Sequence, residues 1–138
     1  MENKNKELLL KDICGGLPYD IKVLYNNKVY SIDYVSAIYE EIKLDNRDNY
    51  TLNISEVKPY LFPLSSITKE QLFEVQEILG KNEIEIKDSF LHIVDSNRNT
   101  ISYSEITTLL EWFYKNHFDI NNLIAMKLAI DATGLNIY

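Results

Sequence analysis

The spacing of hydrophobic residues changes near residue 60. Before this point, apolar residues recur mostly at every second position, as in 21–25 and 30–34, which is typical of strands. After it, the strongest runs repeat at helical spacing, as in 72–79 and 106–113. The chain therefore predicts a β-rich first half and a helix-rich second half.

The first half predicts a short helix over 7–14, ended by Gly15-Gly16, and then four strands in an antiparallel meander. Asn26-Asn27 is expected to make the tight turn of the first hairpin. Alternation predicts which residues of the later strands face the core: Tyr30, Ile32, Tyr34, Ile38, Ile42, Leu44, Tyr50, Leu52 and Ile54.

The second half predicts two longer helices, and each opens with a capping box: Thr68 with Gln71, and Ser102 with Glu105. Gly80 is expected to end the first of them. Between them, 83–87 and 90–94 predict a hairpin that turns at Asp88-Ser89, and after them 121–127 predicts a brief helix and 128–130 a short strand. A meander has one apolar face that needs a cover, and the two helices with the hairpin are expected to supply it. The fold class expected is α+β.

A hinge, defined as residues 56–67, separates the two halves. It holds Pro59 and Pro63 among large apolar side chains. Proline lacks an N–H and restricts the residue before it, which argues against an inner strand or a helix interior. We expect an ordered connector across the core, in which Pro59, Tyr60, Phe62 and Pro63 are structural; a binding groove is the alternative. The halves 1–55 and 68–138 are expected to form one globular domain with the hinge.

Composition and charge limit the classes of partner and location that the chain is expected to have. With 46% hydrophobic and 25% charged residues, the 138-residue chain resembles an ordinary globular protein. It has no run of about 20 apolar residues and no secretion-signal pattern at its start, so a cytoplasmic location is expected and a membrane is not. A formal charge of −7 repels a phosphate backbone. A basic protein partner is favoured over nucleic acid.

Few residues of the chain indicate a catalytic, phosphate-binding or metal-binding site. The glycines form no phosphate-binding loop. Cys14 is the single cysteine, which excludes an internal disulfide, and is expected to be a buried thiol. His117 and Asp119 are too few ligands for a zinc site, and nothing in the sequence brings His92 to them. We expect His117 at a helix end favoured by the helix dipole, Asp119 capping the next helix, and no metal or cofactor.

A Glu-x-Lys pattern occurs twice, at Glu41–Lys43 and Glu85–Lys87. On a strand the two side chains point to the same face, as in nucleases that hold a metal with carboxylates. Opposite charges side by side are also normal on a solvated sheet, and a nuclease needs a basic approach for DNA. Catalysis is therefore the alternative and not the expectation.

Two sets of residues are candidates for contact with a partner. The first is an acidic face made of Glu70, Glu74, Glu77, Glu83 and Glu85. The first three lie at helical spacing on the polar side of one helix. The second set combines aromatic rings with carboxylates, a composition suited to protein contacts: Tyr39, Glu40, Glu41, Tyr103, Glu111 and Trp112.

Three blocks of the chain stand out: LLLKDIC with LPY at 8–19, KPYLFPLSS at 58–66, and HFD with LI and LAIDA at 117–132. Together they resemble a family of small proteins from phages, prophages and other mobile elements of Bacteroidota. The resemblance implies a fold and a mobile-element setting in a bacterial host, and no reaction.

The function expected is a non-catalytic, acidic protein that binds a host protein. Its sharpest form is an anti-defence inhibitor, for example of a CRISPR nuclease, since an effector that handles nucleic acid must present a basic surface. Two alternatives stay open. One is a small metal-dependent enzyme that uses a Glu-x-Lys pair, and the other is a structural or accessory protein that self-associates.

Overall fold

The computed structural model describes residues 1–46, 50–80, 84–87, 90–93 and 102–138. The helices within these ranges are α1 (Asn3–Gly16), α2 (Lys69–Leu79) and α3 (Tyr103–Lys115). The strands are β1 (Val23–Tyr25), β2 (Lys28–Tyr30), β3 (Ile32–Ser36), β4 (Glu41–Leu44), β5 (Leu52–Asn53), β6 (Lys58–Leu61), β7 (Ile84–Lys87), β8 (Phe90–Ile93) and β9 (Ile130–Asp131). This mixture confirms the α+β class.

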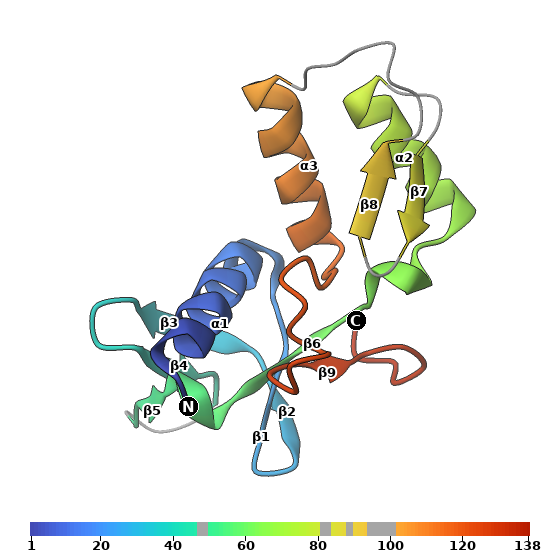
Figure 1. The fold of residues 1–138 in the computed structure, drawn as a ribbon. Helices are drawn as coiled ribbons and strands as arrows, with labels where there is room; N and C mark the ends of the chain where they lie inside the picture. The colour runs from blue at the N-terminus through green and yellow to red at the C-terminus, as the bar shows by residue number, and fades with distance from the viewer. Residues whose placement is uncertain (47–49, 81–83, 88–89, 94–101) are drawn as a thin grey trace.

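The larger sheet runs in the order β2-β1-β6-β9 and carries the hinge as an inner strand (Figure 1). β6 is antiparallel to β1, with Val23 opposite Pro59, and parallel to β9, with Tyr60 opposite Ile130. The expectation that the prolines keep the hinge out of an inner strand is therefore wrong. The expectation of an ordered connector across the core is confirmed.

Pro59 fits inside the sheet because its missing N–H is not needed there. The N–H of Tyr60 donates to the carbonyl of Lys22 on the β1 side, at 2.9 Å. Since successive N–H groups of a strand point to opposite sides, the nitrogen of Pro59 faces the β9 side, where pairing begins only at Tyr60. Beyond β6, the N–H of Phe62 donates to the carbonyl of His117 at 2.8 Å.

The predicted four-stranded meander is divided between two sheets. The β1–β2 hairpin joins β6, whereas β3, β4 and β5 form a separate antiparallel sheet. The turn at Asn26 and Asn27 is confirmed, with positive φ of 47° and 61°, as a type I′ turn requires. The chain leaves the hairpin at Ser31, whose N–H donates to the carboxylate of Asp45 at 2.9 Å and whose carbonyl accepts the N–H of Asp45 at 3.1 Å. These two bonds start the second sheet.

Three residues expected in the core are exposed: Tyr34, Ile38 and Tyr50. A β-bulge lies between Ile32 and Tyr34, so Tyr34 turns outward and Val35 packs against the core instead. Ile38 lies in the turn between β3 and β4, and Tyr50 precedes β5. The prediction failed because a regular alternation does not continue through a bulge or a turn.

The first hydrophobic cluster lies between α1, the strands of the first half and the segment 123–129. Its fully buried members include Leu9, Ile42 and Leu123. Among the described residues, neither α2, α3 nor the β7–β8 hairpin contributes to this cluster. The expectation that the later helices and the hairpin cover the sheet is therefore wrong. α1, which begins at Asn3 and is longer than predicted, covers it with the C-terminal segment.

The second hydrophobic cluster joins α2, the β7–β8 hairpin and α3. Its helices begin as predicted: Thr68 and Gln71 form a capping box, and the Ser102 hydroxyl accepts the N–H of Glu105 at 3.2 Å. Gly80 ends α2 in the left-handed conformation, with φ 57°. The hairpin strands are confirmed, while the turn predicted at residues 88–89 lies outside the described residues.

The segment after α3 is a loop and not the predicted brief helix over 121–127. The carboxylate of Asp119 accepts the N–H groups of Leu123 and Ile124 at 2.8 and 2.9 Å, so it caps a turn. Asn122 and Lys127 have positive φ of 60° and 61°, which an α-helix does not permit. The short strand follows as β9, slightly later than predicted.

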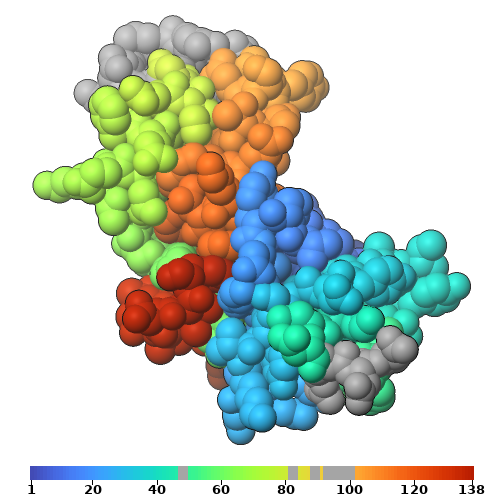
Figure 2. All heavy atoms as spheres, turned by 180° about the vertical axis from the view of Figure 1, so that it is seen from behind, coloured from blue at the N-terminus to red at the C-terminus, as the bar shows by residue number. Residues whose placement is uncertain are grey.

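The two clusters form two parts of the molecule that meet at the hinge. Figure 2 shows α2 and α3 in one part and the first half of the chain in the other, with the C-terminal segment beside the hinge. Assignment of 1–138 to a single domain stays a prediction. Along the described ranges, none of the helices has the length and apolar character needed to cross a membrane.

Candidate functional site

The outer face of α2, defined here as Glu70, Phe73 and Glu77, combines an exposed ring with carboxylates. The helix buries Val75 and Leu79 against the second cluster. Phe73 lies on the opposite side and is 59% exposed. Glu70 precedes it by three residues and Glu77 follows it by four, so all three share one exposed face. The ring therefore stands between two carboxylates.

Glu74 lies at the edge of this face and connects α2 to α3. Its Oε2 accepts a hydrogen bond from Trp112 Nε1 at 2.7 Å. Trp112 is only 9% exposed and stacks on Phe118, with 5.6 Å between ring centroids. The expectation that Trp112 presents its ring to a partner is therefore wrong, because the ring packs between the helices.

The remaining acidic candidates are only partly placed. Glu85 is exposed on β7, and Glu83 lies outside the described residues. That these two residues extend the face of α2 stays a prediction.

The set of aromatic and acidic candidates is split between two surfaces. Tyr39, 72% exposed, lies in the β3–β4 turn of the first half. Tyr103 and Glu111 are exposed on α3, in the other part of the molecule (Figure 1). Glu40 forms an ion pair with Lys6 of α1 at 3.2 Å. The structure does not bring these residues together, so they cannot act as one contact surface.

The four hinge residues have different surroundings. Pro59 and Tyr60 are buried within the sheet, which supports the structural role predicted for them. Phe62 and Pro63 are half-buried, and each lines a hollow. For these two residues the groove alternative from the sequence stays open.

The His117 side chain is half-buried at the end of α3. Its ring stacks face to face on that of Tyr138, with 3.7 Å between centroids and 8° between planes. Burial lowers the pKa of His117 to about 4. His117 lies just after the end of α3, as predicted, and burial there opposes the positive charge that the helix dipole would favour.

The predicted absence of a metal site stays a prediction. Both oxygens of Asp119 accept backbone N–H groups, and the side chain of His92 lies outside the described residues. Within the part of the chain that the structure describes, no three side chains of the types His, Cys, Asp or Glu gather as a metal site would require.

The Glu-x-Lys pairs lie on strands, as predicted. Lys43 Nζ lies 3.4 Å from a carboxylate oxygen of Asp33 on the neighbouring strand, which is an ordinary cross-strand ion pair. Glu41 is half-buried beside it, and Glu85 and Lys87 are exposed on β7. These surroundings do not test the catalytic alternative.

Cys14 is exposed, so the expectation of a buried thiol is wrong. Its neighbour Ile13 is fully buried on the inner side of α1. Since consecutive residues of a helix point about 100° apart, Cys14 turns away from the core. Burial of part of the side chain still raises the pKa of the Cys14 thiol.

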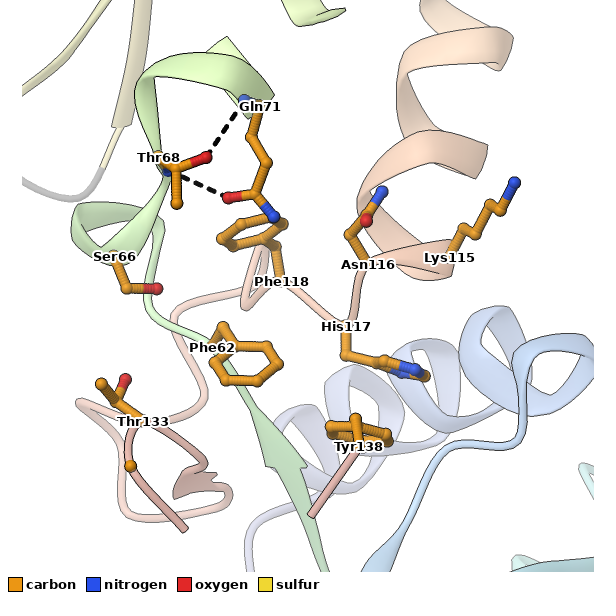
Figure 3. A pocket seen from close by; sticks show the side chains of 11 residues that line it. Phe62, Ser66, Thr68, Gln71, Lys115, Asn116, His117, Phe118, Thr133 and Tyr138 are labelled. Atoms are coloured by element: carbon orange, nitrogen blue, oxygen red, sulfur yellow. Dashed lines mark hydrogen bonds between the residues drawn. The ribbon is translucent and has the colours of Figure 1, made fainter. Parts of the chain in front are cut away.

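A pocket of about 550 Å³ lies where the hinge, the start of α2, the end of α3 and the C-terminal segment meet. We call it the hinge pocket. Figure 3 shows Phe62 in its middle, Gln71 and Phe118 on the α2 side, and Asn116, His117 and Tyr138 on the other sides. Phe62 lies 6.4 Å from Phe118 and 5.9 Å from Tyr138 between ring centroids. Aromatic rings therefore form much of its wall.

The sequence missed both Phe73 and the pocket. Phe73 belongs to the apolar run 72–79 and was not among the candidate contact residues, yet a helical count places it opposite Val75 and between Glu70 and Glu77. The helical spacing of Glu70, Phe73 and Glu77 already indicated a ring between two carboxylates. The pocket has no comparable signal, because Gln71 and Tyr138 come from segments that meet only in the folded chain.

Comparisons with known proteins give no family for this chain: no family model matches it, and no curated protein or solved structure is significantly similar. The resemblance to mobile-element proteins stays a prediction.

Proposed function

We propose that this chain is a non-catalytic protein that binds a basic protein partner through the outer face of α2. One observation carries the proposal: Phe73 is 59% exposed between the exposed carboxylates of Glu70 and Glu77. An aromatic ring supplies a large apolar contact, and carboxylates around it select a positively charged surface. A few anchor residues, among which aromatic rings are common, contribute most of the binding energy of an interface.

The arrangement of charge on α2 supports the same reading. Glu70 and Glu74 are four residues apart, and Glu74 and Glu77 are three apart. Like charges at these spacings destabilise a helix by about 0.2–0.5 kcal/mol per pair. The cluster therefore weakens the free helix slightly, and a basic partner would offset this repulsion when it binds.

In its sharpest form, the partner is a host effector that handles nucleic acid. Such effectors need basic surfaces to hold phosphates, and an acidic domain can occupy that surface. The resemblance to phage and mobile-element proteins makes a defence nuclease, such as a CRISPR effector in the bacterial cytoplasm, the first partner to test.

Site-specific crosslinking tests the proposed face. Phe73 is replaced by p-benzoylphenylalanine in one variant, and the exposed Tyr39 is replaced in a matched control. Both variants are irradiated in cells of the native host, and crosslinked proteins are identified by mass spectrometry. We expect position 73, and not position 39, to capture a protein with a basic surface.

Two results would contradict the proposal. Capture of the same partner from position 39 alone would place the contact on the β3–β4 turn. Capture of a second copy of this chain from position 73 would favour the self-associating alternative.

A further inference from the structure

The hinge pocket has the composition of a small-molecule site, separate from the outer face of α2. Its volume of about 550 Å³ lies in the range of ligand pockets, about 300–1,000 Å³. Among the described residues that line it, none is Asp or Glu, although the whole chain carries a formal charge of −7. The pocket therefore combines aromatic rings with a lining in which, among the described residues, the charged side chain is that of Lys115.

The walls offer flat surfaces for a ring. Phe62 is half-buried directly after β6 and contacts Tyr138. The stacked pair of His117 and Tyr138 is a second flat element, held in place because the Tyr138 hydroxyl donates to the carbonyl of Tyr60 at 2.7 Å and accepts the N–H of Lys22 at 3.1 Å. These bonds fix the wall before any ligand arrives.

Two side-chain amides in the lining are oriented by the backbone. Gln71 Oε1 accepts the N–H of Thr68 at 2.9 Å, so the other end of this amide is its NH₂ donor. Asn116 Nδ2 donates to the carbonyl of Trp112 at 2.8 Å, so its other end is the oxygen acceptor. Within the described residues, neither Gln71 Nε2 nor Asn116 Oδ1 has a hydrogen-bond partner in the protein. The pocket therefore presents one donor and one acceptor beside aromatic rings.

We propose that the hinge pocket binds an aminopurine or aminopyrimidine nucleoside as a free small molecule. The heterocycle lies against Phe62 and the His117–Tyr138 stack, as bases stack on aromatic side chains. Gln71 Nε2 donates to a ring nitrogen, and Asn116 Oδ1 accepts from the exocyclic amino group, so that two amides share the donor and acceptor roles that a single Asn or Gln amide fills towards adenine. A nucleic-acid strand is disfavoured by the charge of the chain, whereas a nucleoside carries no phosphate.

Calorimetric titration with adenosine and with cytidine tests the proposal on the parent chain. Purine riboside, which lacks the amino group, and ribose are the comparison ligands. We expect saturable binding of adenosine or cytidine, binding of purine riboside at least about tenfold weaker, and none of ribose. No saturation with either adenosine or cytidine at millimolar concentration would overturn the proposal, as would equal binding of purine riboside and adenosine.

Gln71→Glu is the decisive variant. Glutamate at this helix position can accept the N–H of Thr68 just as the Gln71 amide does, so α2 keeps its cap while the pocket loses its donor. The nucleoside affinity should fall at least about tenfold. Asn3→Asp, at an exposed position in the first turn of α1, makes the same charge change away from the pocket and should leave affinity unchanged.

Phe62→Leu removes the stacking surface and keeps an apolar side chain, and it should also weaken binding. Thermal melting shows whether Gln71→Glu folds. If it does not, Phe62→Leu still tests the site. Unchanged affinity in a folded Gln71→Glu variant, or in Phe62→Leu, would overturn the assignment of the site. The outcome is independent of whether the outer face of α2 binds a partner.

Discussion

Phe118→Ala is expected to lower the free energy of unfolding by about 4 kcal/mol. Phe118 is 2% exposed, stacks on Trp112, and meets Phe113 edge to face, with 6.2 Å between centroids. Its backbone also forms a parallel bridge with Phe62 of the hinge. Truncation would leave a cavity at the point where the second cluster meets the hinge.

Urea denaturation followed by circular dichroism measures this loss. Phe73→Ala is the matched control, because it removes the same side chain from an exposed position of α2. It should change stability by less than about 0.5 kcal/mol. Similar losses in the two variants would show that the ring of Phe118 does not hold the two parts of the molecule together.

Asp12→Asn is expected to stabilise the protein at pH 8 and to have little effect at pH 4. Asp12 is 1% exposed on α1. Its Oδ1 accepts a hydrogen bond from Asn121 Nδ2 at 2.9 Å, and among the described residues its Oδ2 has no partner. Burial raises the pKa of Asp12 to about 7, with a further contribution from the Asp119 carboxylate, while the bond from Asn121 and the charge of Lys11 oppose the shift.

Proton linkage gives the direction in which the stability of the protein changes with pH. Because the pKa is about 7 in the folded state and 3.8 in the unfolded chain, the folded state binds the proton more tightly. The stability that this proton contributes is complete below about pH 4 and is lost as the pH rises through 7. At about 1.4 kcal/mol for each pKa unit, the loss approaches 4 kcal/mol by pH 8. An asparagine carries no charge and can still accept the bond from Asn121.

Chemical denaturation of parent and variant from pH 4 to pH 8 measures the effect as a difference. His117 titrates in the same range with the opposite sign, since a lowered pKa removes stability as the pH falls. Both proteins contain His117, so its contribution cancels in the difference. A difference that does not change with pH would show that Asp12 is already ionised, and solvated, in the folded protein.

Local patterns in the sequence predicted the ends of α2 and the turn of the first hairpin correctly. Thr68 with Gln71, and Gly80, mark the ends of α2 as expected, because these signals act within a few residues. The turn at Asn26 and Asn27 was equally local. Such features need no knowledge of the rest of the chain.

Features that depend on distant partners were not predictable. Pro59 is acceptable in an inner strand only because β9 begins pairing one residue later. Cover of the sheet by α1 and the segment 123–129 depends on a loop that Asp119 holds together. The spacing of residue types along the sequence indicates neither arrangement.

The candidate site was predictable from the sequence only in part. Glu70 and Glu77 were predicted on the polar face of α2, and the structure exposes both. Phe73 was not among the candidates because it belongs to an apolar run, and only its angle on the helix places it between them. The hinge pocket requires four segments to meet, which only the folded chain shows.

The central claim is that the outer face of α2 binds a basic partner. The association kinetics of two charge-reversal variants test it most directly. One variant carries Glu70→Lys and Glu77→Lys; Glu74 is kept because it accepts the hydrogen bond of Trp112. The control carries Glu2→Lys, directly before α1, and Glu7→Lys on α1. Both residues are exposed, so the two variants have the same net charge.

On-rates to the partner captured from position 73 are measured at low and high salt. The claim predicts association of the α2 variant at least about tenfold slower than that of the control at low salt. The difference should shrink at high salt, because ions screen the exposed charges. Equal on-rates for the two variants would contradict the claim and would show that only the net charge of the protein matters.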